Sequence, residues 1–245
     1  MGGFETLIYE KTDKIAYVTI NRPKAMNAYN IQMRDDLYQI LSAIKDDPDV
    51  YVVIFKGAGE KAFCAGADLS EFLTAPSPIA ARKVRFERDV WGLFLSMPQP
   101  IIAALHGYVL GSGIEIALCC DIRIASRNAR FGLPEVGLGM IPAAGGTQTL
   151  PRTVGKSKAL EMLLIDEWID GEEAFRIGLV NHVVSDDTLY DHANEMARKI
   201  ASHDPAAVRA AKQAVVRGMD VRLSEGLYLE KSLASHLSAS KNKQP

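Results

Sequence analysis

Residues 101–121, IIAALHGYVLGSGIEIALCCD, predict a strand, a glycine-rich turn and a helix in direct succession. The apolar run 101–105 has the length of a buried strand, closely spaced glycines mark a tight passage, and 114–120 starts an apolar helix. A turn of this kind presents backbone N–H groups at the positive end of the helix dipole. The stretch therefore predicts a place that holds a developing negative charge, built where a buried strand meets a helix.

One acidic residue, Glu115, lies in the first turn of this predicted helix among apolar neighbours. A carboxylate in such surroundings is costly unless it is paired, hydrogen-bonded or used in chemistry. The simpler interpretation is a residue that complements the helix dipole, because acidic residues are favoured in the first turn of any helix. Two familiar motifs are excluded: a dinucleotide fingerprint needs glycine where Ile116 stands, and a nucleophile elbow around Ser112 needs glycine where Leu110 stands.

Length and composition limit the class of protein. The chain has 245 residues, 48% of them hydrophobic, which fits one sizeable globular domain or a domain with a small appendage. A net charge of −2 without a basic block argues against a nucleic-acid surface. No apolar run approaches the roughly 20 residues that span a bilayer, so no membrane segment is expected. Cys64, Cys119 and Cys120 form no CxxC pair and lie among apolar residues, which predicts reduced core thiols in a cytoplasmic protein and no zinc site.

In the part of the chain before residues 101–121, the apolar pattern predicts two strands, a helix and a third strand. Residues 4–10 and 14–20 are strand-like, and Asn30 is placed to cap a helix that runs to about Ile44. Residues 51–55 form a fully apolar strand. This order, with short turns, predicts an α/β fold with a parallel or mixed sheet flanked by helices.

The segment 61–69, KAFCAGADL, repeats the pattern of strand, small-residue turn and helix. A strand-like piece reaches Ala65-Gly66-Ala67, and a helix is expected to start near Asp68. Small side chains there let another molecule approach the backbone closely. Taken alone, the segment is better explained as an ordinary tight turn.

A second isolated carboxylate, Glu135, lies in the segment 131–150, which is rich in glycine and proline for so apolar a stretch. We therefore expect a shaped loop there. Two carboxylates in apolar settings are typical of a site that supplies both a general acid and a general base. The alternative for Glu135 alone is a residue that starts a helix after Pro134.

The pattern from residue 156 onward is mostly helical, and it predicts an oligomer because late amphipathic helices often dock on a neighbouring subunit. Asp204-Pro205 is a helix cap followed by proline at the first helical position. One further strand is expected over 122–125. The remaining expected helices are 79–97, 156–165, 171–177, 187–201, 205–217 and 222–238.

Three ordered motifs, CAGADL, GYVLGSGIEIALCCD and FGLPEVGLGMIPAAGGTQ, carry a resemblance to a known family. Over about Lys14 to Leu237 the chain resembles the crotonase superfamily, within it the enoyl-CoA hydratase/isomerase family, and most of all enoyl-CoA hydratase. The resemblance implies an α/β fold, a crotonase-like spiral of ββα turns with a C-terminal helical oligomerisation region. It implies a spiral core with the acyl-CoA site at 1–185 and a helical trimerisation region at 186–245, which builds homotrimers that usually pair into hexamers.

The resemblance also implies roles for individual residues. It places oxyanion-hole donors at the backbone N–H groups of Ala67 and Ser112, which would bind the thioester carbonyl oxygen of an acyl-CoA. It places the two glutamates that hold and activate water at Glu115 and Glu135, with Glu115 chiefly the base and Glu135 the proton donor. The implied reaction is syn addition of water across the 2,3 double bond of a 2-enoyl-CoA thioester, which gives a 3-hydroxyacyl-CoA.

Coenzyme A is part of the substrate, so the resemblance implies no separate cofactor and no metal. The implied partners are the acyl-CoA and copies of the same chain, without nucleic acid or membrane. Two segments are implied to lie along the coenzyme, through Lys24, Ala25, Ala65, Ala67, Asp68, Leu69 and Ser70. Bulky apolar candidates for the acyl pocket are Phe86, Trp91, Phe94, Leu138 and Ile141.

Some positions depart from the family pattern. Ser112 replaces a more usual glycine, Thr149 stands where the family often has arginine, and 164–168 replaces a common Thr-Gly turn, which affects the shape of the pocket there. An enoyl-CoA isomerase and a specialised acyl-CoA hydratase or dehydratase are alternatives within the superfamily. An RNA-associated binding protein on the same fold is an alternative of another class, and so is a serine hydrolase that uses Ser112 and His106.

Overall fold

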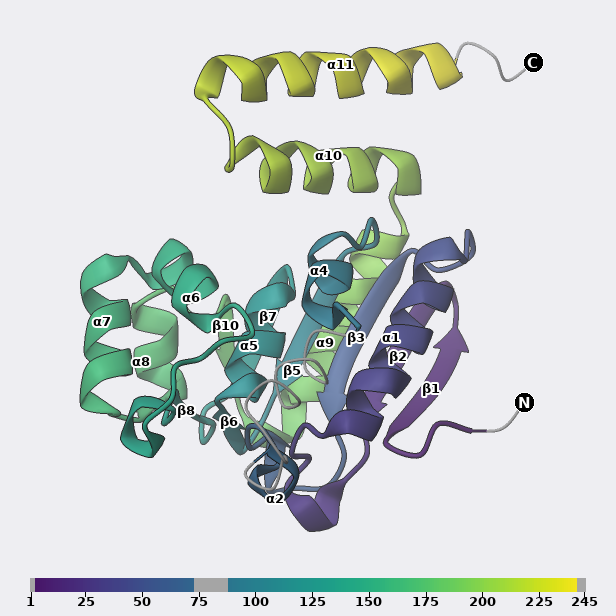
Figure 1. Cartoon of the computed structure of the whole chain (residues 1–245). Helices are drawn as coiled ribbons and strands as arrows, with labels where there is room; N and C mark the ends of the chain where they lie inside the picture. Colours follow the sequence, from purple (N-terminus) through teal and green to yellow (C-terminus); the bar gives the residue numbers. More distant parts are fainter. Residues whose placement is uncertain (1–2, 73–87, 242–245) are drawn as a thin grey trace.

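The computed structural model describes residues 3–72 and 88–241, in which two sheets are surrounded by helices (Figure 1). The larger sheet has the strand order β1-β2-β3-β5-β7-β10, with β1 and β2 antiparallel and the other neighbours parallel. Its strands are β1 Leu7–Thr12, β2 Ile15–Ile20, β3 Val52–Gly57, β5 Ile101–Leu105, β7 Ile122–Ser126 and β10 His182–Val184. The predicted α/β fold with a mixed sheet is confirmed.

A smaller sheet has the strand order β4-β6-β8-β9, in which β9 pairs antiparallel with β8 and the other neighbours are parallel. Its strands are β4 Ala62–Cys64, β6 Tyr108–Leu110, β8 Arg130–Gly132 and β9 Ile169–Asp170. In chain order β4 follows β3, β6 follows β5, and β8 follows β7. Each of these three pairs of consecutive strands adds one strand to the larger sheet and one to the smaller sheet. The carboxyl ends of β4 and β6 lead into the two glycine turns that the sequence singles out.

The helices cover both faces of the large sheet and extend beyond it. They are α1 Ile31–Asp46, α2 Leu69–Phe72, α4 Val90–Leu95, α5 Ser112–Cys119, α6 Gly146–Val154, α7 Lys156–Ile165, α8 Gly171–Arg176, α9 Leu189–Ala201, α10 Pro205–Gly218 and α11 Leu223–Lys241. Short 3₁₀ helices are η1 Pro23–Ala25, η2 Val136–Leu138 and η3 Asp186–Thr188. Figure 1 shows α10 and α11 as a hairpin outside the layers formed by the sheets and the other helices.

The core divides in two because side chains of successive strand residues point to opposite faces of the large sheet. Phe55 and Ala103 belong to the cluster that includes the apolar stripes of α1 and α5. Ile54 and Ile102 belong to the cluster on the other face, where α9 packs. The helix α9 thus covers the sheet directly, whereas the described side chains of α10 and α11 are all at least partly exposed.

Several local predictions are confirmed by the geometry. Asn30 caps α1, since its side-chain oxygen accepts the Met33 N–H at 3.0 Å, and Asp204 caps α10 in the same way. The predicted helix over 156–165 matches α7. The three cysteines are buried thiols, and burial raises the pKa of Cys64 to about 11 and of Cys119 to about 12.

The expectation of a loop over 131–150 is wrong at both ends. Residues 131 and 132 finish β8, and α6 begins at Gly146. The helix that follows the glycine-rich turn within 101–121 also begins earlier than predicted, at Ser112 rather than at Ile114. The expected helix over 79–97 lies partly outside the described residues, and within them α4 forms its later part. In the described ranges, no helix combines the length and apolar character needed to cross a membrane.

Candidate active site

The two glycine turns after β4 and β6 lie against each other. A Cβ atom on Gly66 would be 3.4 Å from the Leu110 carbonyl oxygen, and one on Gly111 would be 3.5 Å from the Gly66 Cα. Both glycines have positive φ, +104° and +48°, a conformation that side chains disfavour. Gly113 packs closer still, because a Cβ there would be 2.2 Å from the Cys64 carbonyl oxygen. Close approach of the backbones therefore brings together the turns that carry Ala67 and Ser112.

The N–H groups of these two residues point away from the backbone that supports them. Tyr29 pairs with Ala67 in a parallel bridge: the Tyr29 N–H donates to Gly66 at 2.8 Å, and the Asp68 N–H donates to Tyr29 at 2.8 Å. In such a bridge the N–H of Ala67 itself points to the opposite side. Ser112 is the first residue of α5, a position whose N–H projects from the helix end. Both predicted donors thus present N–H groups where an anionic oxygen can bind.

Glu115 is held rigidly one turn into α5. Its side chain is 1% exposed, and its Oε1 accepts the N–H groups of Ala144 at 2.8 Å and Gly146 at 3.0 Å. A Cβ on Gly146 would lie 3.1 Å from that oxygen, so the start of α6 closes directly on the carboxylate. Two N–H donors to one oxygen suit an ionised carboxylate, which is the form that a general base requires.

Glu135 reaches the same place from a different element. It precedes η2, where its carbonyl oxygen accepts the N–H groups of Leu138 at 3.1 Å and Met140 at 2.8 Å. Its side chain is half-buried, and its Oε1 lies 2.6 Å from where a Cβ on Gly111 would be. The Oε2 atoms of both glutamates are buried. The structure therefore places Glu135 beside the turn that leads into α5, with Glu115 one turn further along that helix.

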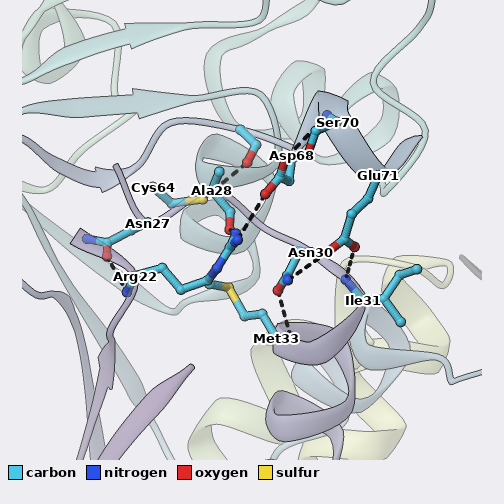
Figure 2. A network of polar contacts seen from close by, with 11 residues as sticks. Arg22, Asn27, Ala28, Asn30, Ile31, Met33, Cys64, Asp68, Ser70 and Glu71 are labelled. Carbon is cyan, nitrogen blue, oxygen red and sulfur yellow. Dashed lines mark hydrogen bonds and ion pairs between the residues drawn. The ribbon is translucent and has the colours of Figure 1, made fainter. Parts of the chain in front are cut away.

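The segments predicted to lie along coenzyme A run side by side (Figure 2). The Ala65 N–H donates to the Met26 carbonyl at 3.1 Å, and Arg22 forms an ion pair with Asp68 at 3.0 Å. The Ser70 hydroxyl donates to Asp68 at 2.6 Å. Lys24 is exposed on η1 at the edge of this network.

The Asp68 side chain is thus occupied in joining the two segments. The Ser70 hydroxyl and the Arg22 guanidinium, acting against partial burial, lower the pKa of Asp68 below its usual range. Glu71 extends the same network, since it accepts the Asn30 side-chain N–H and the Ile31 backbone N–H, both at 2.9 Å (Figure 2). What remains for a ligand here is the partly exposed Ala65, the exposed apolar side chain of Leu69 and the exposed Ser70.

Sequence reasoning missed the residues that hold the reactive groups. Ala144 and Gly146 donate to Glu115, and Arg22 joins the two segments that are predicted to lie along coenzyme A, yet these residues were not singled out. The Gly145-Gly146 pair was the available signal, because Gly145 has a φ of +109° and turns the chain onto the carboxylate. In the part of the chain that the structure describes, no three His, Cys, Asp or Glu side chains gather as metal ligands.

Two glycine turns in contact, with two carboxylates beside them, form the kind of arrangement that oxyanion stabilisation combined with proton transfer requires. A family model described as enoyl-CoA hydratase/isomerase matches residues 10–244. The chain therefore belongs to the enoyl-CoA hydratase/isomerase family, as its motifs predicted.

Individual relatives agree over most of the chain. The short-chain-enoyl-CoA hydratase of Clostridium acetobutylicum is 47% identical over 225 residues, which cover 91% of this chain and 86% of that protein. The (E)-benzylidenesuccinyl-CoA hydratase of Thauera aromatica is 44% identical over 230 residues, 93% of this chain and 87% of that one. The crystal structure of an enoyl-CoA hydratase from Bacillus anthracis superposes with a TM-score of 0.91 at 38% identity, covering 98% of this chain and 97% of that one.

Proposed function

We propose that this enzyme adds water to the 2,3 double bond of a 2-enoyl-CoA thioester and releases a 3-hydroxyacyl-CoA. The observation that carries the proposal is the placement of two carboxylates, Glu115 and Glu135, beside one pair of backbone N–H turns. Hydration requires a hydroxyl at Cβ and a proton at Cα, and two positioned carboxylates supply both. The names of the relatives support the same reaction.

In this proposal the N–H groups of Ala67 and Ser112 bind the thioester carbonyl oxygen. Electron density moves from the double bond onto that oxygen as Cβ is attacked, so donors that wait there stabilise the transition state more than the substrate. One such donor typically contributes about 10²–10³ in rate. Because the backbone donates, Ser112 performs as well here as the glycine more usual in the family.

Proton transfer is assigned to the two glutamates. Glu115 accepts a proton from water, whose oxygen forms the new bond to Cβ. Glu135 gives a proton to Cα, where the electron pair of the former double bond ends. The products are the 3-hydroxyacyl-CoA and a pair of carboxyl groups that exchange one proton to reset. The hydrogen bonds from Ala144 and Gly146 support the choice of Glu115 as the base, because they favour its ionised form.

The acyl group is proposed to lie along the chain that follows Glu135. Leu138 and Ile141 are 53% and 64% exposed there, so their apolar side chains are open to contact with an acyl chain. Of the other candidates, Trp91 packs against Tyr29, Phe94 is fully buried against Phe55, and Phe86 lies outside the described residues. We assign a short 2-enoyl chain, on the strength of the 47% identical short-chain enzyme.

Assembly and compartment are part of the proposal. Homotrimers, paired into hexamers, are supported by the apolar side chains exposed on α10, on α11 and between them: Val215, Met219, Leu223, Leu227 and Tyr228. A cytoplasmic location is supported by the three buried thiols. Light scattering of the purified protein measures the assembly, and a monomeric mass would overturn that part of the proposal.

The test of the reaction uses crotonyl-CoA and the loss of its enoyl-thioester absorbance. Hydration by the wild type, with 3-hydroxybutyryl-CoA as the product identified by mass, is the expected result. Isomerisation of a 3-enoyl-CoA without hydration would favour the isomerase instead. Hydration of a bulky aromatic enoyl-CoA but not of crotonyl-CoA would replace the short acyl chain by a specialised one. A protein that binds no CoA ester would overturn the proposal altogether.

A further inference from the structure

Residues 164–168, which depart from the family pattern, end directly before β9. They contact the strand that leads to Glu135. Strands β8 and β9 pair in the register Arg130 with Asp170 and Phe131 with Ile169. The next position along this register sets Trp168 across from Gly132. Residues directly opposite each other in an antiparallel pair project to the same face. The indole of Trp168 therefore lies over a residue that has no side chain.

The contact between Trp168 and Gly132 is close. A Cβ on Gly132 would be 2.5 Å from Cδ1 and 2.8 Å from Nε1 of the indole, and all three of the nearest atoms belong to Trp168. Tyr108 on β6 meets the same indole edge-on, with ring centres 5.8 Å apart. Trp168 thus touches both β6 and β8, although its side chain is 44% exposed.

These two strands end in the two halves of the reactive site. Strand β6 continues into Gly111 and Ser112, and β8 continues through Leu133 and Pro134 to Glu135. The Gly132 carbonyl accepts the Gly111 N–H at 3.0 Å, which joins the strand ends directly. A displacement of Gly132 therefore moves the oxyanion turn and Glu135 relative to each other.

The same turn contacts the chain on the far side of Glu135. Asp166 adopts the left-handed conformation, with φ of 56° and ψ of 36°, at the end of α7. Its Oδ2 lies 3.0 Å from where a Cβ on Gly137 would be, and its Oδ1 is buried. The turn thus meets the chain three residues before Glu135, through Trp168, and two residues after it, through Asp166.

We infer that Trp168 is a positioning residue, which sets Glu135 against the oxyanion turn by packing on Gly132 and Tyr108. This inference rests on the proposed hydratase reaction and adds a residue to it. Removal of the indole leaves β8 free to shift toward the vacated space. A shift of about 1 Å at a reacting group costs up to about 10²-fold in rate. Neither Gly132 nor Tyr108, the two residues that the indole contacts, belongs to the segments 22–30 and 65–70 where the coenzyme is proposed to bind, so KM should change little.

The first experiment compares crotonyl-CoA hydration by the wild type, Trp168→Ala and Trp168→Phe, each assayed below its unfolding midpoint measured by circular dichroism. We expect Trp168→Ala to lower kcat about tenfold with KM within twofold, and Trp168→Phe to keep at least half of kcat, since a ring still covers Gly132. The matched control is Phe175→Ala on α8, which deletes an aromatic ring that is 53% exposed and should leave kcat unchanged.

Two double variants decide whether Trp168 acts through the contacts described. In a Glu135→Gln background, Trp168→Ala should lower kcat less than twofold, because the group that it positions is gone. Gly132→Ala should lower kcat by pushing the indole away, and Gly132→Ala/Trp168→Ala should return to within twofold of Trp168→Ala alone. If the two substitutions of either double variant lowered kcat independently, so that their fold losses multiplied, the inference would be overturned.

The outcomes separate this inference from the proposed function. An active wild type with an equally active Trp168→Ala variant would overturn the positioning role and leave the hydratase proposal intact. A wild type without hydratase activity would overturn both.

Discussion

The two carboxylates of the proposed reactive site are held in opposite ways. Glu115 lies on a buried helix, is 1% exposed, and is held by two backbone N–H groups from a distant segment. Glu135 lies at the entrance to a single 3₁₀ turn, is half-buried, and is followed by exposed apolar residues. One carboxylate is fixed by the core, and the other by the packing of a surface segment.

The difference suggests a division of labour. A base that activates water benefits from a fixed orientation and a stable charge, because the attacking oxygen must meet Cβ along one line. A proton donor to Cα must adapt to the acyl group lying beside it, and a segment at the surface tolerates such adjustment. The contrast predicts that changes in the α5 half affect chemistry most and that changes in surrounding segments affect it progressively less.

The largest effect is expected for Glu115→Gln. The amide oxygen still accepts the two N–H groups, so the fold should be kept, but the side chain no longer takes a proton from water. We expect kcat for crotonyl-CoA to fall by about 10³-fold or more, with the unfolding midpoint within a few degrees of the wild type. Initial rates and thermal unfolding measure the two quantities, and a loss below tenfold would remove Glu115 from the reaction.

Glu135→Gln should follow with a loss of about 10²-fold in kcat. The loss should be smaller than for Glu115 because Glu115 still activates the water that attacks Cβ, and only the proton transfer to Cα loses its donor. The measurement is the same hydration assay, with exchange of the Cα hydrogen in deuterated water as a second readout. A loss larger than that of Glu115→Gln would reverse the assignment of the two halves.

Gly111→Ala tests how closely the halves are packed. The new methyl would lie 2.6 Å from the Glu135 Oε1, and φ of +48° strains any side chain, so we expect a loss of about 1–3 kcal/mol in unfolding free energy and about tenfold in kcat. Gly139→Ala is the control, because φ there is +73° but a Cβ meets nothing within 4 Å. It should cost stability and leave kcat intact; equal losses of kcat in both variants would contradict the contact with Glu135.

The smallest effect is expected at the two segments that are predicted to lie along the coenzyme. Asp68→Asn removes the ion pair with Arg22 and should cost about 1 kcal/mol of unfolding free energy at pH 7, with kcat unchanged. The pKa of Asp68 is lowered below its usual 3.8, so its contribution is complete above that value and is lost as the pH falls below it. Urea unfolding at pH 7 should therefore show a difference in stability between wild type and variant, and this difference should disappear when the pH is lowered below the pKa of Asp68.

The parts of the fold that local sequence controls were predictable. Asn30 and Asp204 cap helices through bonds to residues two or three positions away, and the buried apolar stripe of α1 recurs at helical spacing from Leu37 to Ile44. The short strands β6, β8 and β9 were not predicted, because two or three residues carry no periodicity and their pairing partners are distant in the chain. The helix α6 was missed since it begins with glycine and contains Pro151.

The candidate site likewise has residues that the sequence could single out and residues that it could not. Glu115 and Glu135 could be singled out because a carboxylate among apolar residues needs a reason. Their partners could not, because Ala144 and Gly146 act through backbone N–H groups that every residue type except proline possesses. Trp168 gave a departure from the family pattern but no role, since its contact with Gly132 depends on the register of two strands.

The tether between Glu115 and the start of α6 has a consequence for the order of folding. The acceptor oxygen and its two donors are separated by 29 and 31 residues of chain. On the ribosome, α5 emerges carrying a carboxylate that its apolar surface would bury, and burial without donors costs several kcal/mol. We therefore expect the helix to dock stably only after residue 146 has been synthesised, and the chain from α5 to α6 to acquire its structure as one cooperative unit.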